Sequence, residues 1–192
     1  MELLNEIENR RARRALSSEP LSRECLTRLV KAATFAPSCF NNQPWRLIVL
    51  EKAAASPEYE AVAAALTPGN AWALAAPVLF VFATGNHLDC RLDDGRDYAY
   101  FDLGQAAMAL QLQAVHEGLY AHPMAGFAPA KVRAAVHLPP ELVPVCVIAV
   151  GAPGSMTQLN EGQQKAEVSE RIRKNLSEVA FLNSYGNGAD FS

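Results

Sequence analysis

Apolar residues recur at helical spacing in five segments of the chain, so we expect five helices there. The predicted helices span residues 2–15, 22–36, 58–66, 97–118 and 129–136. Ser22 is a suitable N-cap for the second helix, and Pro37 ends it after Leu26 and Leu29 have formed its apolar face. Residues 97–118 are apolar almost all the way round, which requires burial on most sides and favours a subunit interface as one of them.

Continuous apolar runs predict strands over residues 46–50, 78–82 and 145–150, and a short extended piece ends at Pro123. The tail, residues 164–191, combines a basic helical turn with an apolar stretch at 179–182 that has the composition of a further strand. Helices and strands are mixed without regular βαβ alternation, so the pattern favours an α+β fold. No repeat, low-complexity tract or linker divides the sequence, and we expect residues 1–192 to form a single domain.

Composition supports a folded chain. Of the 192 residues, 50% are hydrophobic and 19% are charged, which is enough apolar material for a core and argues against disorder. The longest apolar run, residues 71–83, is too short to span a membrane and contains Pro77. The acidic N-terminus has no secretory apolar region, and Cys25, Cys39, Cys90 and Cys146 show no zinc or disulfide spacing. We therefore expect a cytoplasmic protein with reduced thiols and no membrane association.

Basic residues form two clusters at opposite ends of an acidic chain. The net charge is −3, which does not suit a nucleic-acid-binding protein. The first cluster is Arg10, Arg11, Arg13 and Arg14, and the second is Arg171, Arg173 and Lys174. Two local cationic clusters favour one compact anion such as a phosphate, because Arg guanidinium groups bind phosphate oxygens in pairs. The alternative is that each cluster is the solvated face of a helix.

Several familiar chemistries have no motif in this sequence. No G-x-G-x-x-G, Walker A or G-x-S-x-G pattern is present, and the four histidines have no metal-ligand spacing. Cys39 has no motif that pairs it with a base, so a nucleophilic thiolate is disfavoured. We therefore expect no bound metal and no catalytic dyad or triad.

Six short motifs are spread along the chain: residues 10–16 (RRARRAL), 37–45 (PSCFNNQPW), 68–72 (PGNAW), 102–105 (DLGQ), 123–127 (PMAGF) and 171–174 (RIRK). In this order they resemble motifs of the nitroreductase family of FMN-dependent oxidoreductases. Residues 37–45 are similar to the family's P-S-S-x-N-x-Q-P-W, and residues 10–16 are similar to its opening R-R-S-x-R-x-F. The resemblance therefore extends over nearly the whole chain.

The resemblance implies an intertwined α+β homodimer with a central mixed or antiparallel sheet flanked by helices, and FMN bound between the subunits. It also implies that Arg10, Arg171 and Arg173 bind the FMN phosphate, and that Arg14 stabilises the reduced flavin at its pyrimidine edge. Gly126 would let the backbone approach flavin N5. The positions implied to contact FMN are Arg10, Arg11, Ala12, Arg14, Pro37, Ser38, Cys39, Asn41, Asn70, Met124, Ala125, Gly126, Arg171 and Arg173.

Three positions depart from the family pattern. Ala12 and Cys39 replace serines, and Ala125 stands where one branch of the family has glutamate. We expect FMN binding to survive these changes, and substrate range to depend on them.

By this resemblance, NAD(P)H reduces FMN and a small electron acceptor then takes its place in a ping-pong reaction through flavin N5. The acceptor would be a nitroaromatic, a quinone or an activated alkene, and no protein acid or base is required. The alternatives are a relative that dehalogenates or fragments flavin, a flavin binder without NAD(P)H turnover, and a nucleic-acid protein that uses the first arginine cluster.

Overall fold

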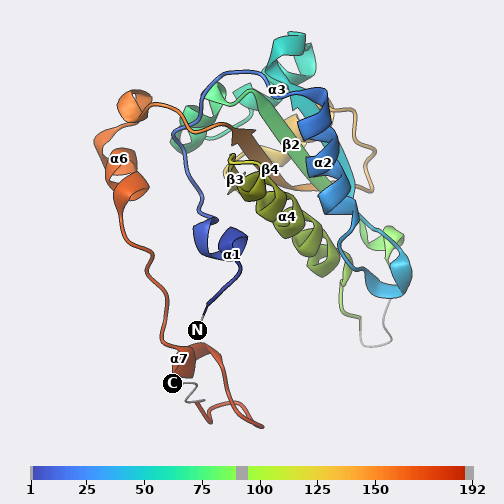
Figure 1. The fold of residues 1–192 in the computed structure, drawn as a ribbon. Coiled ribbons are helices and arrows are strands. Elements are labelled where there is room, and N and C mark those ends of the chain that lie inside the picture. The colour runs from blue at the N-terminus through green and yellow to red at the C-terminus, as the bar shows by residue number, and fades with distance from the viewer. Residues whose placement is uncertain (1, 90–94, 189–192) are drawn as a thin grey trace.

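A four-stranded antiparallel sheet forms the centre of the fold (Figure 1). The computed structural model describes residues 2–89 and 95–188. The strands are β1 (Arg46–Glu51), β2 (Val78–Thr84), β3 (Tyr120–Met124) and β4 (Val143–Gly151), in the spatial order β1-β2-β4-β3. Every residue of β2 is buried, as expected for a central strand rich in aromatic and β-branched residues.

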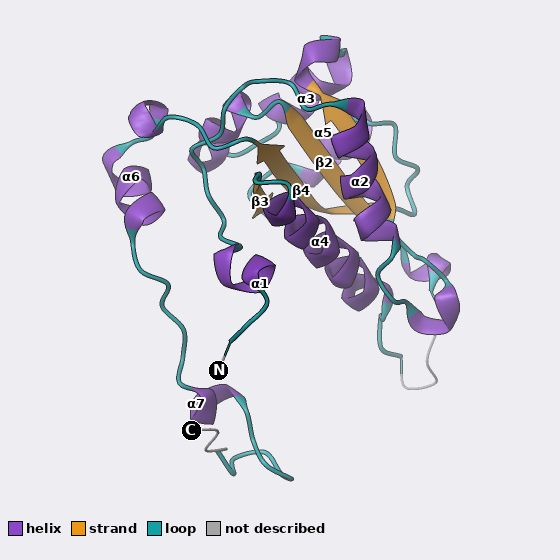
Figure 2. Ribbon diagram, viewed as in Figure 1, coloured by secondary structure: helices purple, strands orange, loops and turns teal. Residues whose placement is uncertain are grey.

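Helices cover both faces of this sheet. Phe80 and Phe82 of β2 pack toward α2 (Arg23–Thr34) and α4 (Ala99–His116), which lie in front of the sheet in Figure 2. The alternate residues Leu79 and Val81 pack toward α3 (Pro57–Ala64), α5 (Pro129–Ala135) and the 3-10 helix η3 (Pro68–Ala75). Successive strand residues point to opposite faces, so the chain has two apolar clusters, one on each side of the sheet. The remaining 3-10 helices are η1 (Cys39–Asn41), η2 (Lys52–Ala54), η4 (Asn86–Leu88) and η5 (Met156–Gln158).

The α+β prediction and most predicted elements are confirmed. The three predicted strands and the extended piece before Pro123 form β1 to β4, and the helices expected at 22–36, 58–66, 97–118 and 129–136 are α2 to α5. The Ser22 hydroxyl accepts the backbone N–H of Cys25 at 3.1 Å, which confirms Ser22 as an N-cap. The outer surface of α4 leaves Tyr100, Phe101 and Met108 exposed.

The predicted N-terminal helix is wrong for most of its length. Only α1 (Asn5–Asn9) is helical, and the chain from Arg10 to Ala15 contains no helix. A helix there would place guanidinium groups three and four residues apart on one face, where like charges repel. The non-helical backbone instead forms hydrogen bonds with the distant C-terminal segment.

The tail also differs from the prediction. It contains α6 (Glu161–Val168) and α7 (Leu176–Val179), whereas the basic residues 171–174 lie in the non-helical chain between them. Residues 179–182 form no strand, and Phe181 makes only an isolated bridge with Gly188. Phe191, at the end of the predicted tail, lies outside the described residues. Residues 68–72, the PGNAW motif, form the first part of η3.

Cys25 is buried, Cys39 and Cys146 are partly buried, and Cys90 lies outside the described residues. In the described part of the chain, no helix is both long and apolar enough to cross a membrane.

Candidate functional site

The two basic clusters meet at one cavity of about 270 Å³ between the N-terminal and C-terminal segments. Its walls come from residues 10–14, which follow α1, and from the end of α6 with the chain after it. The alternative of two separately solvated helix faces is therefore wrong. The cavity is lined by Arg10, Arg11, Ala12, Arg14, Ala166, Glu170, Arg171, Ile172 and Arg173.

Hydrogen bonds from two of these arginines hold the segments together. The Arg171 guanidinium donates to the carbonyls of Glu8 and Arg10 at 2.7 and 2.6 Å. In the opposite direction, the Arg11 guanidinium donates to the Ser169 carbonyl at 2.6 Å. Each of these arginines thus uses part of its donor capacity to fix the walls of the cavity.

Arg10 is different, because its side chain has no hydrogen-bond or ion-pair partner among the described residues. Burial lowers the pKa of Arg10, and the charges of Arg171, Arg173 and Arg11 lower it further. Arginine still stays protonated in proteins. The cavity therefore concentrates positive charge that an anion would neutralise.

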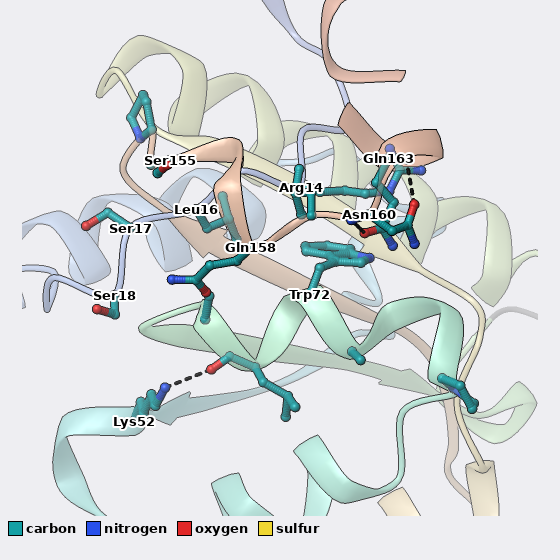
Figure 3. Close-up of a pocket in the computed structure, with 17 residues that line it drawn as sticks. Arg14, Leu16, Ser17, Ser18, Lys52, Trp72, Ser155, Gln158, Asn160 and Gln163 are labelled. Carbon is teal, nitrogen blue, oxygen red and sulfur yellow. Dashed lines mark hydrogen bonds between the residues drawn. The ribbon is translucent and has the colours of Figure 1, made fainter. Parts of the chain in front are cut away.

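Arg14 also lines a second cavity of about 800 Å³ (Figure 3), so the two cavities adjoin at its side chain. This second cavity is walled by η3, by the chain after Arg14 and by the segment leading into α6. Glu167 of α6 lies behind Arg14, where its Oε1 accepts the Arg14 backbone N–H at 2.9 Å. A residue of α6 therefore fixes the backbone of Arg14, and Arg14 lines both cavities.

Trp72 on η3 gives the second cavity a buried donor. The indole is 7% exposed, and its Nε1 has no hydrogen-bond partner among the described residues. An unpaired buried donor costs about 1–3 kcal/mol, so a ligand acceptor or water at this position would be stabilising. The Trp72 ring packs on His122 with centroids 4.4 Å apart. Burial, followed by the charge of Arg14, lowers the pKa of His122 to about 4, so its imidazole is neutral near pH 7.

Asn70 and Gly126 lie against each other. The Asn70 Nδ2 donates to the Gly126 carbonyl at 2.9 Å, and a Cβ added at Gly126 would lie 2.6 Å from Thr67 Oγ1 and 2.8 Å from Asn70 Nδ2. A side chain at position 126 would therefore have to displace the side chains of Thr67 and Asn70. Met124 is buried in the core, whereas Ala125 is exposed.

The predicted flavin loop lies elsewhere. Pro37, Ser38 and Cys39 line a third cavity of about 460 Å³ at the start of α4, and Asn41 is not part of its lining. Figure 1 shows this end of the molecule well apart from α1 and α6. A single chain therefore brings the arginines together but does not bring residues 37–41 to them.

Local contacts give this loop an unusual conformation. The Cys39 backbone N–H donates to the buried Asp102 carboxylate at 2.9 Å. Phe40, Asn41 and Gln43 have positive φ angles of 48°, 57° and 49°, a region that costs non-glycine residues energy. Strain of this kind at three neighbouring positions is typical of a functional loop.

The described residues suit an anionic, acceptor-rich ligand. Arg10, Arg171 and Arg173 could hold a phosphate, while Arg14 and the unpaired Trp72 donor could contact oxygens or nitrogens of its body. Within the ranges 2–89 and 95–188, no group of three or more His, Cys, Asp or Glu side chains could hold a metal ion.

Three residues of this site were not predicted. Trp72 and Asp102 belong to motifs quoted above, but the motifs assign no contact to either side chain. Glu167 carries no signal at all, because it is one of several acidic residues in a polar tail.

Comparison with known proteins identifies relatives over most of the chain. The model of the nitroreductase family matches residues 7–152. An uncharacterized 15.4 kDa protein in the ask 5′ region of Mycolicibacterium smegmatis is 34% identical over 139 residues, which is 70% of this chain and 88% of that protein.

Solved structures share the fold. The crystal structure of an oxidoreductase containing FMN is 27% identical, with a TM-score of 0.85 over 96% of this chain and 93% of that one. A nitroreductase family protein from Clostridium difficile 630 is 22% identical, with a TM-score of 0.75 over 96% and 99% of the two chains.

Proposed function

The chain belongs to the nitroreductase family of oxidoreductases, and on this premise we propose that it binds FMN and uses NAD(P)H to reduce small electron acceptors. The acceptors are nitroaromatics, quinones or activated alkenes. The observation that carries the proposal is the meeting of arginines from both ends of the chain around one cavity. The FMN content of the related oxidoreductase supports the same cofactor.

In this proposal Arg10, Arg171 and Arg173 bind the FMN phosphate. Guanidinium groups match phosphate oxygens with charge-assisted hydrogen bonds, and the dianion offsets the repulsion that Arg10 experiences from its neighbours. Arg11 lies beside the phosphate or the ribityl chain. The small side chain of Ala12 leaves space at the cavity wall but supplies no hydroxyl.

Toward the flavin ring, the proposal assigns Arg14, Asn70 and the Trp72 indole N–H to the pyrimidine edge. Each is a hydrogen-bond donor, and Arg14 adds a fixed positive charge where reduction places negative charge. In this proposal the exposed Ala125 and the half-buried Gly126 lie along the ring, where small side chains leave the flavin accessible, and the buried Met124 lies behind them. Bound FMN supplies hydride transfer at N5, first from NAD(P)H and then to the acceptor in the same place.

We also propose that the protein is a homodimer in which residues 37–41 complete the site of the partner. The separation of this loop from the arginine cavity within one chain supports that arrangement. Phe40 at the loop and Phe101 on α4 are 82% and 57% exposed, which is unusual for large apolar side chains unless another surface covers them. The tail is similarly apolar and exposed at Ile172, Leu176 and Val179.

The test is direct. The purified protein should show a flavin absorption spectrum, retain about one FMN per chain, and oxidise NADPH or NADH when menadione or nitrofurazone is added. Protein that neither retains nor binds FMN would refute the proposal. Protein that binds FMN but leaves it oxidised when NADH or NADPH is added would be a flavin binder, and reduction without transfer to these acceptors would indicate another reductive activity.

A further inference from the structure

Arg14 is held by a single buried carboxylate from the C-terminal segment. Glu167, at the end of α6, has a side chain only 4% exposed. Its Oε1 accepts the Arg14 backbone N–H at 2.9 Å and lies 3.7 Å from Arg14 Nη1. One carboxylate oxygen thus contacts both the main chain and the side chain of Arg14.

A buried carboxylate is destabilising unless it is paired and hydrogen-bonded. Glu167 and Asp102 are the buried acidic residues in the part of the chain that the structure describes. Asp102 holds the backbone N–H of Cys39, whereas the contacts of Glu167 are to Arg14. The position of this charge is therefore tied to Arg14 alone.

The arginine cavity consequently differs in charge from one end to the other. At Arg10, the charges that lower its pKa are those of Arg171, Arg173 and Arg11, and all of them repel it. At Arg14, an acidic side chain lies behind the guanidinium. The Arg10 end is thus mainly positive, with the exposed Glu170 as the acidic residue of its lining, whereas a buried carboxylate partly neutralises the Arg14 end.

We infer that Glu167 is a positioning residue for Arg14, and that it also moderates the positive charge that Arg14 presents to bound FMN. This inference rests on the proposed function. The carboxylate fixes the backbone and guanidinium of Arg14 at the junction of the two cavities. The guanidinium can then donate to the flavin edge without a change in its conformation. Because the carboxylate is anionic, it opposes the preference of Arg14 for reduced FMN and keeps the flavin a stronger reductant.

The Glu167→Gln variant separates charge from geometry. Glutamine keeps an oxygen that can accept the Arg14 N–H but removes the negative charge. We expect the affinity for reduced FMN relative to oxidised FMN to rise about tenfold, which is about +30 mV in the midpoint potential of a two-electron couple. Glu170→Gln is the matched control, because Glu170 lines the same cavity but is exposed and forms no ion pair within the described residues. In a background of Arg14→Ala, the effect of Glu167→Gln should shrink.

A second measurement does not need FMN. In the deflavinated protein, hydrogen exchange at the Arg14 amide should accelerate at least tenfold in Glu167→Ala and stay close to wild type in Glu167→Gln. If FMN binds but its potential is the same in Glu167→Gln and Glu170→Gln, the inference is overturned while the proposed function stands. If the wild-type chain binds no FMN, the proposed function and the electrostatic part of the inference both fall. Unchanged Arg14 exchange in Glu167→Ala would overturn the positioning role.

Discussion

Arg10 offers the sharpest test of the cavity, because its guanidinium has no partner within the described residues. Arg10→Ala therefore removes a ligand contact without breaking an internal one. A hydrogen bond to a charged group is worth about 1.5–3 kcal/mol. At about 1.4 kcal/mol for each factor of ten, the variant should bind FMN roughly 10- to 150-fold more weakly than wild type.

In the absence of FMN, Arg10→Ala should not weaken the protein: its stability should stay the same or rise. Burial and the charges of Arg171 and Arg173 lower the pKa of Arg10, which means that the folded chain disfavours its charged form. Deflavinated Arg10→Ala should therefore unfold at the same temperature as wild type or a higher one. Arg171→Ala should instead lower both affinity and stability, because Arg171 donates to backbone carbonyls of the N-terminal segment.

Both quantities can be measured on deflavinated protein, affinity by quenching of FMN fluorescence and stability by thermal unfolding. Arg13→Ala is the matched control, since Arg13 belongs to the same cluster but does not line the cavity. Arg10→Ala binding FMN within about twofold of wild type would refute the phosphate assignment. An equal loss of FMN affinity in Arg13→Ala would show that the effect comes from the net charge of the segment and not from a contact with Arg10.

Three further substitutions test neighbouring parts of the site. A Cβ at Gly126 would lie 2.8 Å from Asn70 Nδ2, so Gly126→Ala should lower the free energy of unfolding, measured by thermal unfolding, by about 1–3 kcal/mol. Gly69→Ala is the control and should not lower it, because a Cβ there has no atom within 4 Å. Trp72→Phe removes the unpaired donor, so FMN affinity should fall about fivefold or more while the deflavinated protein loses little stability in denaturant titrations. Burial lowers the pKa of His122 to about 4, so the free energy of unfolding should fall by up to roughly 3 kcal/mol as pH drops from about 6.5 toward 4. Between about pH 7 and pH 5, the melting temperature of His122→Phe should therefore fall less than that of the wild type.

The sheet and its covering helices were predictable because their sequence patterns are strong. Residues 78–82 are an unbroken apolar run, and they became a strand buried along its whole length. Ser22 and Pro37 bracket α2 with local chemistry that needs no tertiary information. In these segments the local preference agrees with the packing, so the sequence alone was sufficient.

The N-terminal segment was mispredicted because long-range contacts decide its conformation. Residues 10–15 contain good helix formers, yet their backbone groups bond to Glu167 and Arg171, more than 150 positions away in the chain. Helix propensity is a weak preference that such contacts override. The two arginine clusters could be related to one anion from their composition, but Glu167 could not be found, since only its burial distinguishes it from the other acids of the tail.

The proposed place of residues 37–41 in the partner's flavin site leads to a prediction about two chains. If each site takes its arginines from one subunit and this loop from the other, two different defects can complement each other. We would co-express Arg10→Ala/Arg173→Ala with Ser38→Ala/Asn41→Ala under separate tags and purify the mixed dimer. In that dimer one site carries both sets of substitutions and the other carries neither, as follows from twofold symmetry.

The mixed dimer should therefore bind about one FMN per two chains with wild-type affinity, although each parent dimer binds it weakly. FMN titration of the doubly tagged fraction measures this directly, and the wild-type dimer carried through the same tags is the control. If each site were built within one chain, both sites of the mixed dimer would keep a defect. No high-affinity site would then appear, and this result would refute the proposal that residues 37–41 complete the partner's cavity.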